Sequence, residues 1–397
     1  FSNFKFGKAK LDLIKELELL IIDEVSMLRC DTLDAIDTIL RTLRKKMNEP
    51  FGGVQVLFIG DLFQLPPVVK EEEWAMLHDY YDTPFFFSAL VMKESNFRNI
   101  EFSHIYRQSD EKFIRLLNKV RNNEMLEDDF NMLNERYQPE VVTELEDYIT
   151  LSTHNVKVDR INQQQLQKIE GDAYEFKAVI EGDFYENSYP TEANLVFKVG
   201  AQVMFIRNDS NAEKRFYNGK LATIKKVTSN EITVAFFDNG DELVVEKEKW
   251  ENIKYNYNAE TDKIEEEVMG SFFQYPLRLA WAITIHKSQG LTFEKAVIDA
   301  GRAFAAGQVY VALSRCTTIN GLFLSTPITA TAIMSDQRIV DFTDNYLSSE
   351  EDLQRQLPLC KIEFAKVQLV KAFEWSKPVE VLAQFYLLTE EKKFADK

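Results

Sequence analysis

Two apolar segments of this sequence run directly into acidic side chains. Residues 19–22 are followed by Asp23 and Glu24, and residues 54–60 are followed by Asp61. Ligands of an open parallel sheet lie at the carboxyl ends of its strands, so we expect both acidic sets at one edge of a sheet. A carboxylate there can hold Mg²⁺, and an adjacent acid can serve as a base toward water. The simpler alternative is that Asp23 and Glu24 only begin the next helix.

Gln64 follows the second apolar segment, in the stretch FIGDLFQLPPVV. A Gln at this edge can hydrogen-bond a terminal phosphate or the water that attacks it. In this interpretation Asp23 holds the metal through its hydration shell and Glu24 orients the water, which is the chemistry of nucleotide hydrolases. A nuclease built on the carboxylates of Asp23, Glu24 and Asp61 is an alternative, but it would need further acidic ligands at strand ends.

Two arginines lie in short segments that could supply positive charge to a phosphate. Arg107 is in IYRQSD, and Arg315 ends the run VYVALSR. A guanidinium has five donors and a fixed charge, so an Arg that reaches across a domain cleft can stabilise a γ-phosphate. Hydrolysis then depends on closure of the cleft. The alternative for each Arg is a surface salt bridge.

The segment TIHKSQG contains a different set of polar residues. His286, Lys287 and Ser288 can donate to a phosphodiester backbone. Gly290 either closes a helix or allows close approach of the backbone. His286 could instead be an imidazole of the core. Phe63, beside the presumed groove, could stack on a base.

Hydrophobic patterning places these residues on an α/β scaffold. The continuous apolar run at 19–22 predicts a strand that is buried on both faces, as in a parallel sheet. Apolar residues at helical spacing predict a helix over 31–47, and residues 54–60 predict a second strand. A strand, a helix and a strand joined by short connections indicate an α/β layered domain.

A second α/β unit is predicted to begin near Ser109, and a β-rich insertion interrupts it. From about residue 199 to residue 268, short β-type runs alternate with turns. The hairpin dipeptides Asn218-Gly219 and Asn239-Gly240 predict a small antiparallel β-barrel there. The segment from about residue 348 is charged and predicted to be helical. The strands of the second α/β unit are expected at 147–153, 295–301 and 321–326.

Composition narrows the class of protein. The chain has 397 residues, enough for two or three domains. Its net charge of −17 argues against coating nucleic acid by bulk attraction, but it leaves a local basic groove open. Cys30, Cys316 and Cys360 lie far apart, which favours a reducing, cytoplasmic location. No apolar run is long enough to cross a bilayer, so no membrane association is expected.

Together, the motifs resemble those of superfamily 1B DNA helicases of the Pif (petite integration frequency) and RecD-like kind. IIDEVSM resembles motif II of that family, and GDLFQLPPV resembles motif III. IYRQSD resembles motif IV, TIHKSQGLTF motif V and VYVALSRCTT motif VI. The matching segments follow the family's order between residues 11 and 326.

The resemblance implies a fold of two RecA-like parallel-sheet domains, with an SH3-like antiparallel β-barrel inserted in the second. The first domain is expected to lack its N-terminal part, and the C-terminal extension has no assigned role. The expected limits are 1–108 for the first domain, 109–198 and 271–347 for the second, 199–270 for the insertion and 348–397 for the extension.

The resemblance also implies ATP-driven, 5′-to-3′ movement along single-stranded DNA, with unwinding at duplex junctions, by a monomer that uses ATP and Mg²⁺. RNA is the alternative track. The catalytic roles fall to Asp23, which also holds the Mg²⁺, and to Glu24, Gln64, Arg107 and Arg315. The residues expected at the nucleotide are Asp61, Gln108, Gln289 and Gly290. The residues expected at the nucleic acid are Phe63, Thr153, His154, Asn155, His286, Lys287 and Ser288.

One element of the family pattern does not occur in the sequence, the phosphate loop GxxxxGKS or GxxxxGKT. Gly7 and Lys8 are followed by Ala9, so FKFGKAK is not such a loop. We therefore expect the loop to lie before Phe1 and the chain as given to bind and hydrolyse ATP poorly. The alternative is a non-catalytic remnant that binds nucleic acid or a partner. Retention of all the catalytic candidates argues against it, because a pure binding module needs none of them.

Overall fold

The structure is a computed structural model, and it describes residues 8–95, 97–142, 148–211, 213–229, 231–258, 263–346 and 350–373, with 375, 378–379, 381–383 and 385–387. It forms two compact units, each described by itself here. The first consists of Phe1–Asn96 and His104–Phe342, and the second of Phe97–Ser103 and Thr343–Lys397. Gly7 and the expected strand start at Asp147 lie outside the described residues.

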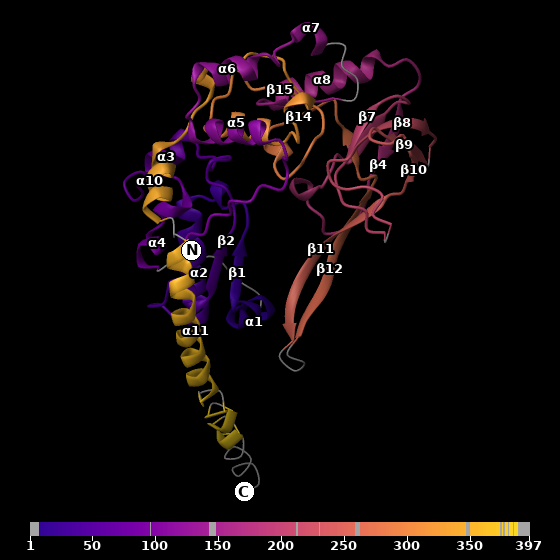
Figure 1. The fold of residues 1–397 in the computed structure, drawn as a ribbon. Coiled ribbons are helices and arrows are strands. Elements are labelled where there is room, and N and C mark those ends of the chain that lie inside the picture. Colours follow the sequence, from indigo (N-terminus) through magenta and orange to yellow (C-terminus); the bar gives the residue numbers. More distant parts are fainter. Residues whose placement is uncertain are drawn as a thin grey trace. The chain divides into compact units, whose positions relative to one another are not determined.

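The N-terminal part of the first unit is a strand–helix–strand layer. Strands β1 (Leu19–Ile22) and β2 (Gln55–Phe58) pair in parallel, and helix α2 (Cys30–Arg44) crosses between them (Figure 1). Leu33 and Leu40 of α2 are buried, so one face of this helix supplies the core of the layer. Helix α2 ends at Arg44 and not at 47 as predicted, because the next residue, Lys45, adopts the left-handed conformation.

The side chains of β1 are less buried than the apolar run predicted. Leu19 is 45% exposed and Ile21 is 54% exposed. Successive side chains of a strand point to opposite faces. The expectation of burial on both faces is therefore wrong for the described part of the chain.

Shorter helices complete this region. Helix α1 precedes β1, and α3 and α4 follow β2. Phe85 and Phe86 of PFFFSAL are buried between α3 and α4, where they add to the core. The bounds are Lys8–Glu16 for α1, Glu71–Leu77 for α3 and Leu90–Glu94 for α4.

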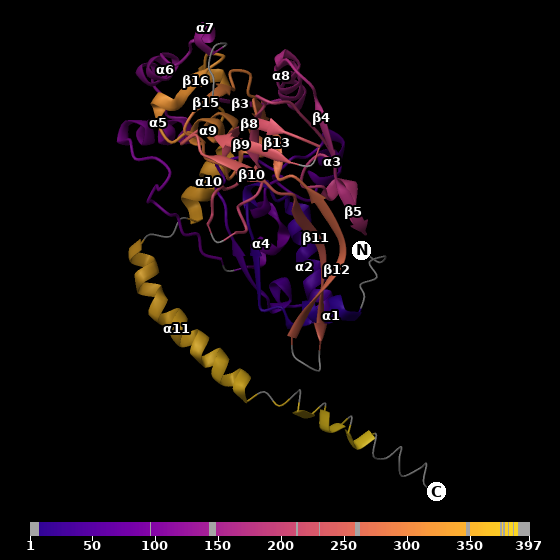
Figure 2. The same cartoon turned by 90° about the vertical axis from the view of Figure 1, so that its right-hand side faces the viewer.

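A second α/β layer contains a four-stranded parallel sheet in the order β14-β3-β15-β16. Figure 2 shows its strands β3, β15 and β16 beside one another. The predicted parallel α/β architecture is confirmed. Strand β14 lies in a segment for which no strand was predicted, and the other strands are shorter than expected. The strands are β3 (Ile149–Ser152), β14 (Ala282–Thr284), β15 (Ala296–Asp299) and β16 (Leu322–Leu324).

Five helices belong to this second layer. Asp110 caps α5 by accepting hydrogen bonds from the amides of Lys112 and Phe113, which satisfies donors at the helix start. The core includes Phe113, Leu116 and Leu151. The helices are α5 (Glu111–Asn122), α6 (Glu127–Asn134), α7 (Pro139–Val142), α8 (Asn155–Lys168) and α9 (Gln308–Ser314).

The β-rich region contains a five-stranded antiparallel sheet in the order β10-β9-β8-β7-β13. Its strands are β7 (Gln202–Phe205), β8 (Leu221–Val227), β9 (Ile232–Phe236), β10 (Glu242–Val245) and β13 (Leu277–Leu279). Gly219 and Gly240 have φ of +100° and +74°, as the predicted turns require. Within the described residues the two outer strands, β10 and β13, do not pair with each other, so the predicted closed barrel stays a prediction.

A long hairpin and a short ribbon accompany this sheet. Strands β11 and β12 form a long hairpin (Figure 1). Strand β12 also pairs with β5, and β4 pairs with β6. These antiparallel strands begin well before residue 199, where the insertion was expected to start. The bounds are Tyr174–Lys177 for β4, Val179–Gly182 for β5, Asn194–Phe197 for β6, Glu248–Asn258 for β11 and Lys263–Gln274 for β12.

Helix α10 (Gln337–Tyr346) leads out of the first unit. Within that unit, the Phe342 ring stacks on the Phe87 ring at 4.3 Å between centroids. The second unit is dominated by α11 (Glu350–Ala372), which agrees with the predicted helical extension.

Short 3₁₀ turns connect the elements: η1 Val25–Met27, η2 Pro50–Gly53, η3 Phe86–Ser88, η4 Glu186–Ser188, η5 His286–Ser288, η6 Ile319–Gly321 and η7 Ala330–Ala332. Among the described residues, no helix is both long and apolar enough to cross a membrane.

Truncation of the second core should be costly. Leu151 is fully buried in β3, so we expect Leu151→Ala to lower the free energy of unfolding by about 2–5 kcal/mol through lost burial and a cavity. Val156→Ala is the matched control, because Val156 is 71% exposed on α8 and its loss should cost less than about 0.5 kcal/mol. Chemical denaturation followed by circular dichroism measures both, and equal losses would contradict this core assignment.

Candidate functional site

The turn after β1 presents the first two acidic residues. The Asp23 carboxylate accepts a hydrogen bond from the Glu24 amide at 2.8 Å. Glu24 has φ 49° and ψ 45°, the left-handed conformation that few residues other than glycine adopt. Such local strain is characteristic of functional sites. Asp23 is exposed and Glu24 is half-buried, so both can meet a ligand.

The turn after β2 lies against the turn after β1. The Val25 amide donates to the Ile59 carbonyl at 3.0 Å. A side chain at Gly60 would place its Cβ 2.9 Å from the Val25 nitrogen, so this close approach requires glycine. The carboxyl ends of β1 and β2 are therefore neighbours, as the sequence predicted.

Asp61 shapes the turn that presents Gln64. Its carboxylate accepts hydrogen bonds from the Phe63 amide at 3.1 Å and from Gln64 Nε2 at 3.3 Å. The Gln64 amide also donates to the Asp61 carbonyl at 3.0 Å. Asp61 was predicted to bind the nucleotide. In this structure its carboxylate holds the turn of which Gln64 is a part.

Gln289 connects this edge to the second α/β layer. Its Nε2 lies 2.9 Å from Glu24 Oε2 and 3.5 Å from Gln64 Oε1. Gln289 follows β14 and η5, whereas Glu24 and Gln64 follow β1 and β2. One amide group therefore joins three of the predicted site residues from two sheets.

Arg315 contributes a buried positive charge to the same area. It follows α9, is 2% exposed, and its Nε donates to the Val311 carbonyl at 3.2 Å. The Arg315 pKa is lowered to about 10. Burial is the largest cause, and the positive charge of Arg107 is the second. The nearby charges of Glu24 and Asp61 act in the opposite direction but are outweighed.

Arg107 is the second cation. Its Nε donates to Thr292 Oγ1 at 3.0 Å and its Nη1 to the Ser314 carbonyl at 3.2 Å. Burial lowers the Arg107 pKa. The next residue, Gln108, is buried, and its Nε2 donates hydrogen bonds to the carbonyls of Ser314 and Cys316 at 2.9 and 2.8 Å. Gln108 therefore supports the segment around Arg315 in this structure.

The two guanidinium groups fit an anionic ligand. Within the described parts of the chain, neither Arg107 nor Arg315 forms an ion pair with a carboxylate. Two desolvated cations close to one another favour binding of a multiply charged anion such as a polyphosphate. The exposed carboxylate of Asp23 is a suitable ligand for Mg²⁺, which keeps several waters and uses few protein ligands.

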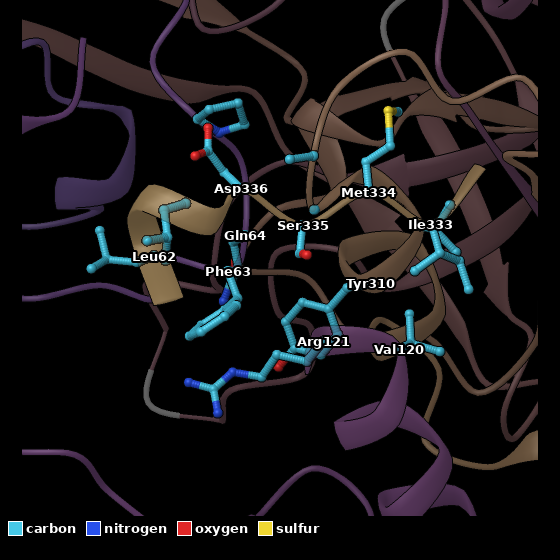
Figure 3. A pocket seen from close by; sticks show the side chains of 15 residues that line it. Leu62, Phe63, Gln64, Val120, Arg121, Tyr310, Ile333, Met334, Ser335 and Asp336 are labelled. Atoms are coloured by element: carbon cyan, nitrogen blue, oxygen red, sulfur yellow. The ribbon is translucent and has the colours of Figure 1, made fainter. Parts of the chain in front are cut away.

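Motif III also packs closely on the start of α9. Gly307 has φ +76°, and a Cβ there would lie 1.9 Å from the Gln64 carbonyl oxygen. The Arg121 guanidinium lies 4.3 Å from the Phe63 ring centroid, and its Nε is 3.8 Å from Asp61 Oδ1. Phe63, Tyr310 and Arg121 line one pocket, and Figure 3 shows their side chains beside one another. The Tyr310 pKa is raised to about 12, mainly by burial and in addition by the charge of Asp61.

The predicted nucleic-acid residues of motif V are presented differently from one another. Lys287 is exposed, whereas His286 is half-buried and burial lowers its pKa. Ser288 is fully buried and its hydroxyl donates to the Ile285 carbonyl at 2.7 Å, so it holds the turn and is not displayed at the surface. Gly290 has φ +77° with open space around it, which favours turn closure over close backbone approach.

Thr153, His154 and Asn155 follow the neighbouring strand. Strands β3 and β14 are adjacent, and the Ile285 amide donates to the Ser152 carbonyl at 2.9 Å. Thr153 Oγ1 lies 2.7 Å from His154 Nδ1, and Asn155 begins α8. Both predicted nucleic-acid groups therefore lie at the carboxyl edge of the second sheet.

Three residues of the site were not predicted from the sequence. Tyr310 and Gly307 lie in or beside the segment VYVALSR, where the spacing to Arg315 could have indicated a role. Arg121 is one of many basic residues on helix surfaces, and no local signal separates it from the others. Its contact with Phe63 arises only when α5 packs next to the motif III turn.

Comparisons with known proteins show which family this chain resembles over most of its length. Residues 2–130 match the model of the PIF1-like helicase family. The ATP-dependent DNA helicase Pif1 of Campylobacter jejuni is 31% identical over 384 residues, covering 89% of this chain and 80% of that protein. Human ATP-dependent DNA helicase PIF1 is 30% identical over 81% of this chain, which spans only 48% of the human protein.

Solved structures give the same result. Bacteroides sp Pif1 in complex with ADP-AlF4 matches with a TM-score of 0.80 and 43% identity, covering 86% of this chain and 78% of that chain. Bacteroides Pif1 bound to ssDNA matches with a TM-score of 0.62 and 43% identity, covering 87% of this chain and 79% of that chain.

Glycine at 307 should be required for contact with motif III. Gly307 and Gly240 have nearly the same φ, +76° and +74°, so alanine at either should cost about 1 kcal/mol for the backbone conformation. Only Gly307→Ala also collides with Gln64, because Gly240 has no atom within 4 Å of its Cβ position. We expect a further loss of about 1–3 kcal/mol at Gly307, measured by chemical denaturation. Equal losses would contradict the close contact.

Removal of a desolvated charge should stabilise the ligand-free protein. We expect Arg315→Met to raise the free energy of unfolding by about 1 kcal/mol or more, because it replaces an unneutralised buried cation with an apolar side chain. Arg29→Met is the control, since Arg29 pairs with Asp31 and Glu73 and its loss should destabilise by about 1 kcal/mol. Loss of stability in both variants would contradict the assigned environment of Arg315.

Proposed function

Because this chain belongs to the PIF1-like helicase family, we propose that it is the motor part of an ATP-dependent DNA helicase that moves along single-stranded DNA. The observation that supports this most strongly is the contact of the Gln289 amide with Glu24 and Gln64. It links a predicted nucleic-acid segment to predicted hydrolytic residues. Curated relatives are named ATP-dependent DNA helicases, and related structures contain ADP-AlF4 or ssDNA.

Each site residue has a role in this proposal. Asp23 would hold Mg²⁺, which would neutralise phosphate charge. Glu24 accepts a proton from the attacking water, and Gln64 orients that water. Arg107 and Arg315 stabilise the charge that develops on the γ-phosphate. The burial of Arg315 strengthens its interaction, because screening by water is weak in the interior.

Gln289 is proposed to report nucleic-acid binding to the hydrolytic residues. His286, Lys287 and the residues after β3 would contact the DNA backbone, and movement of η5 would shift Gln289 relative to Glu24. Gly290, next to it, allows the turn to close without crowding. Asp61 and Gln108 position Gln64 and the Arg315 segment through the hydrogen bonds already described.

The finer architecture is also part of the proposal. We infer two RecA-like domains, with limits near 1–108 and 109–347, and an SH3-like insertion near 199–270. The protein would act as a monomer, travel 5′ to 3′ and open duplex junctions, with RNA as the alternative track. The absence of GxxxxGKS and GxxxxGKT from these 397 residues supports slow ATP turnover by this chain alone.

The hydrolytic proposal is tested in a protein that contains this chain together with a phosphate-binding loop. We expect single-stranded DNA to raise its ATPase rate, and Glu24→Gln to lower kcat by about 100-fold or more through loss of the base. Binding of a labelled oligonucleotide should change little. Steady-state ATPase assays and fluorescence anisotropy measure the two effects.

Glu124→Gln is the control, because Glu124 is exposed just after α5 and should leave the rate unchanged. Unchanged turnover in the Glu24 variant would overturn the assignment. Oligonucleotide binding without DNA-stimulated hydrolysis would favour the non-catalytic alternative. Magnesium-dependent cleavage of DNA without ATP would favour the nuclease alternative.

A further inference from the structure

The loop between β15 and α9 presents an aromatic side chain to solvent. Strand β15 ends at Asp299 and α9 begins at Gln308. Phe304, in this loop, is 61% exposed, although most large apolar side chains around it belong to the core. Strand β15 pairs with β3, so the loop leaves the same carboxyl edge as His154 and the motif V turn.

Hydrogen bonds fix the backbone of this loop, so the Phe304 ring is exposed because of the conformation of the loop. Gln308 is fully buried, and its Oε1 accepts from the amides of Phe304 and Ala305 at 3.0 and 3.4 Å. The Ala303 amide donates to the Ala300 carbonyl at 3.0 Å. These contacts order the backbone on both sides of Phe304 without burying its side chain. An exposed aromatic on an ordered loop is suited to contact a planar ligand.

The surroundings of the ring suit a nucleic-acid strand. The His154 ring lies 5.2 Å from the Phe304 ring, with an angle of 55° between their planes. Close by, the Asp299 carboxylate is paired with Lys157 Nζ at 2.6 Å and accepts from Ser152 Oγ at 2.8 Å. The negative charge at this edge is therefore compensated, which reduces repulsion of a phosphate backbone.

Phe63, the aromatic residue expected to stack on a base, is less suited to this role. It is only half-exposed, and the Arg121 guanidinium lies over its ring at 4.3 Å. Phe304 has no cation over its ring among the contacts of the described residues. Stacking needs an accessible face, so the comparison favours Phe304.

We propose that Phe304 is a base-stacking residue of the single-stranded DNA site, a role that rests on the proposed function. A base lies against the Phe304 ring beside His154, while the donors after β3 and β14 contact the backbone. Stacking is tolerant of base identity, because each base has a π face. The contact therefore suits a protein that must pass over any sequence.

The test measures binding of a fluorescein-labelled thymidine oligonucleotide to the 397-residue chain by anisotropy, without ATP. We expect Phe304→Leu to weaken binding about 10-fold, since it keeps an apolar side chain but removes the ring. Tyr185→Leu is the matched control, because the exposed fraction of Tyr185, an aromatic residue of the β-rich region, is 68%, similar to the 61% of Phe304. It should bind as the wild type does.

Two further measurements isolate stacking. On an oligonucleotide made of abasic sites, the wild type and Phe304→Leu should bind with equal affinity. A Phe304→Trp variant should retain binding, and its added fluorescence, obtained by subtracting the wild-type titration, should be quenched by the thymidine oligonucleotide.

Each outcome distinguishes this inference from the proposed function. Absence of binding by the wild type would count against the proposed function itself. Equal binding by the wild type and Phe304→Leu would overturn the stacking role alone. A loss that persists on abasic DNA, or an unquenched Phe304→Trp variant, would also overturn it.

Discussion

Arg315 places a guanidinium group in the interior of the protein, and the half-buried Arg107 places a second one near it. Burial of like charges is unfavourable, and it lowers the pKa of both side chains. The cost is offset only in part, by hydrogen bonds to Thr292, Val311 and Ser314. A multiply charged anion would neutralise both guanidinium groups. The preference of the site for such a ligand therefore follows from two positive charges that no carboxylate of the described residues neutralises.

Glu24, whose charge acts on Arg315, is positioned by a small number of close contacts. Glu24 adopts a left-handed conformation, Gly60 allows the turn after β2 to approach it, and Gln289 joins it to Gln64. Each of these contacts tolerates little displacement. A change in the position of η5 relative to β1 would therefore alter the hydrogen bonds of Glu24 directly, and in the proposed function this links nucleic-acid contact to hydrolysis.

The loop from β15 to α9 lies next to both kinds of site. Phe304 is at its exposed end, and Gly307 lies against the Gln64 carbonyl. Helix α9 then leads to Arg315. Residues 304 and 315 are 11 positions apart, so a short segment connects an exposed aromatic side chain to a buried guanidinium group. Because this segment is short and hydrogen-bonded, a displacement of Phe304 would be expected to affect Arg315.

Much of the scaffold could be predicted from local pattern. Apolar runs that end on Asp23 and Asp61 predicted neighbouring strand ends, because parallel strands bring their carboxyl termini to one edge. The helix predicted over 31–47, observed as α2, and the turns at Gly219 and Gly240 followed from helical spacing and from hairpin dipeptides. Partial exposure of β1 could not be predicted, because an apolar run reports hydrophobicity and not which faces are covered.

The sequence by itself determined the identity and order of the chemical groups: carboxylates after two strands, glutamines beside them, and arginines far along the chain. Tertiary structure alone decided their partners. The contact of Gln289 with Glu24 spans 265 residues, and that of Gln108 with Ser314 spans 206. Burial of the Ser288 hydroxyl and the Arg121 contact with Phe63 likewise depend on which surfaces pack together. Such contacts are set by packing of distant segments, and local spacing contains no information about it.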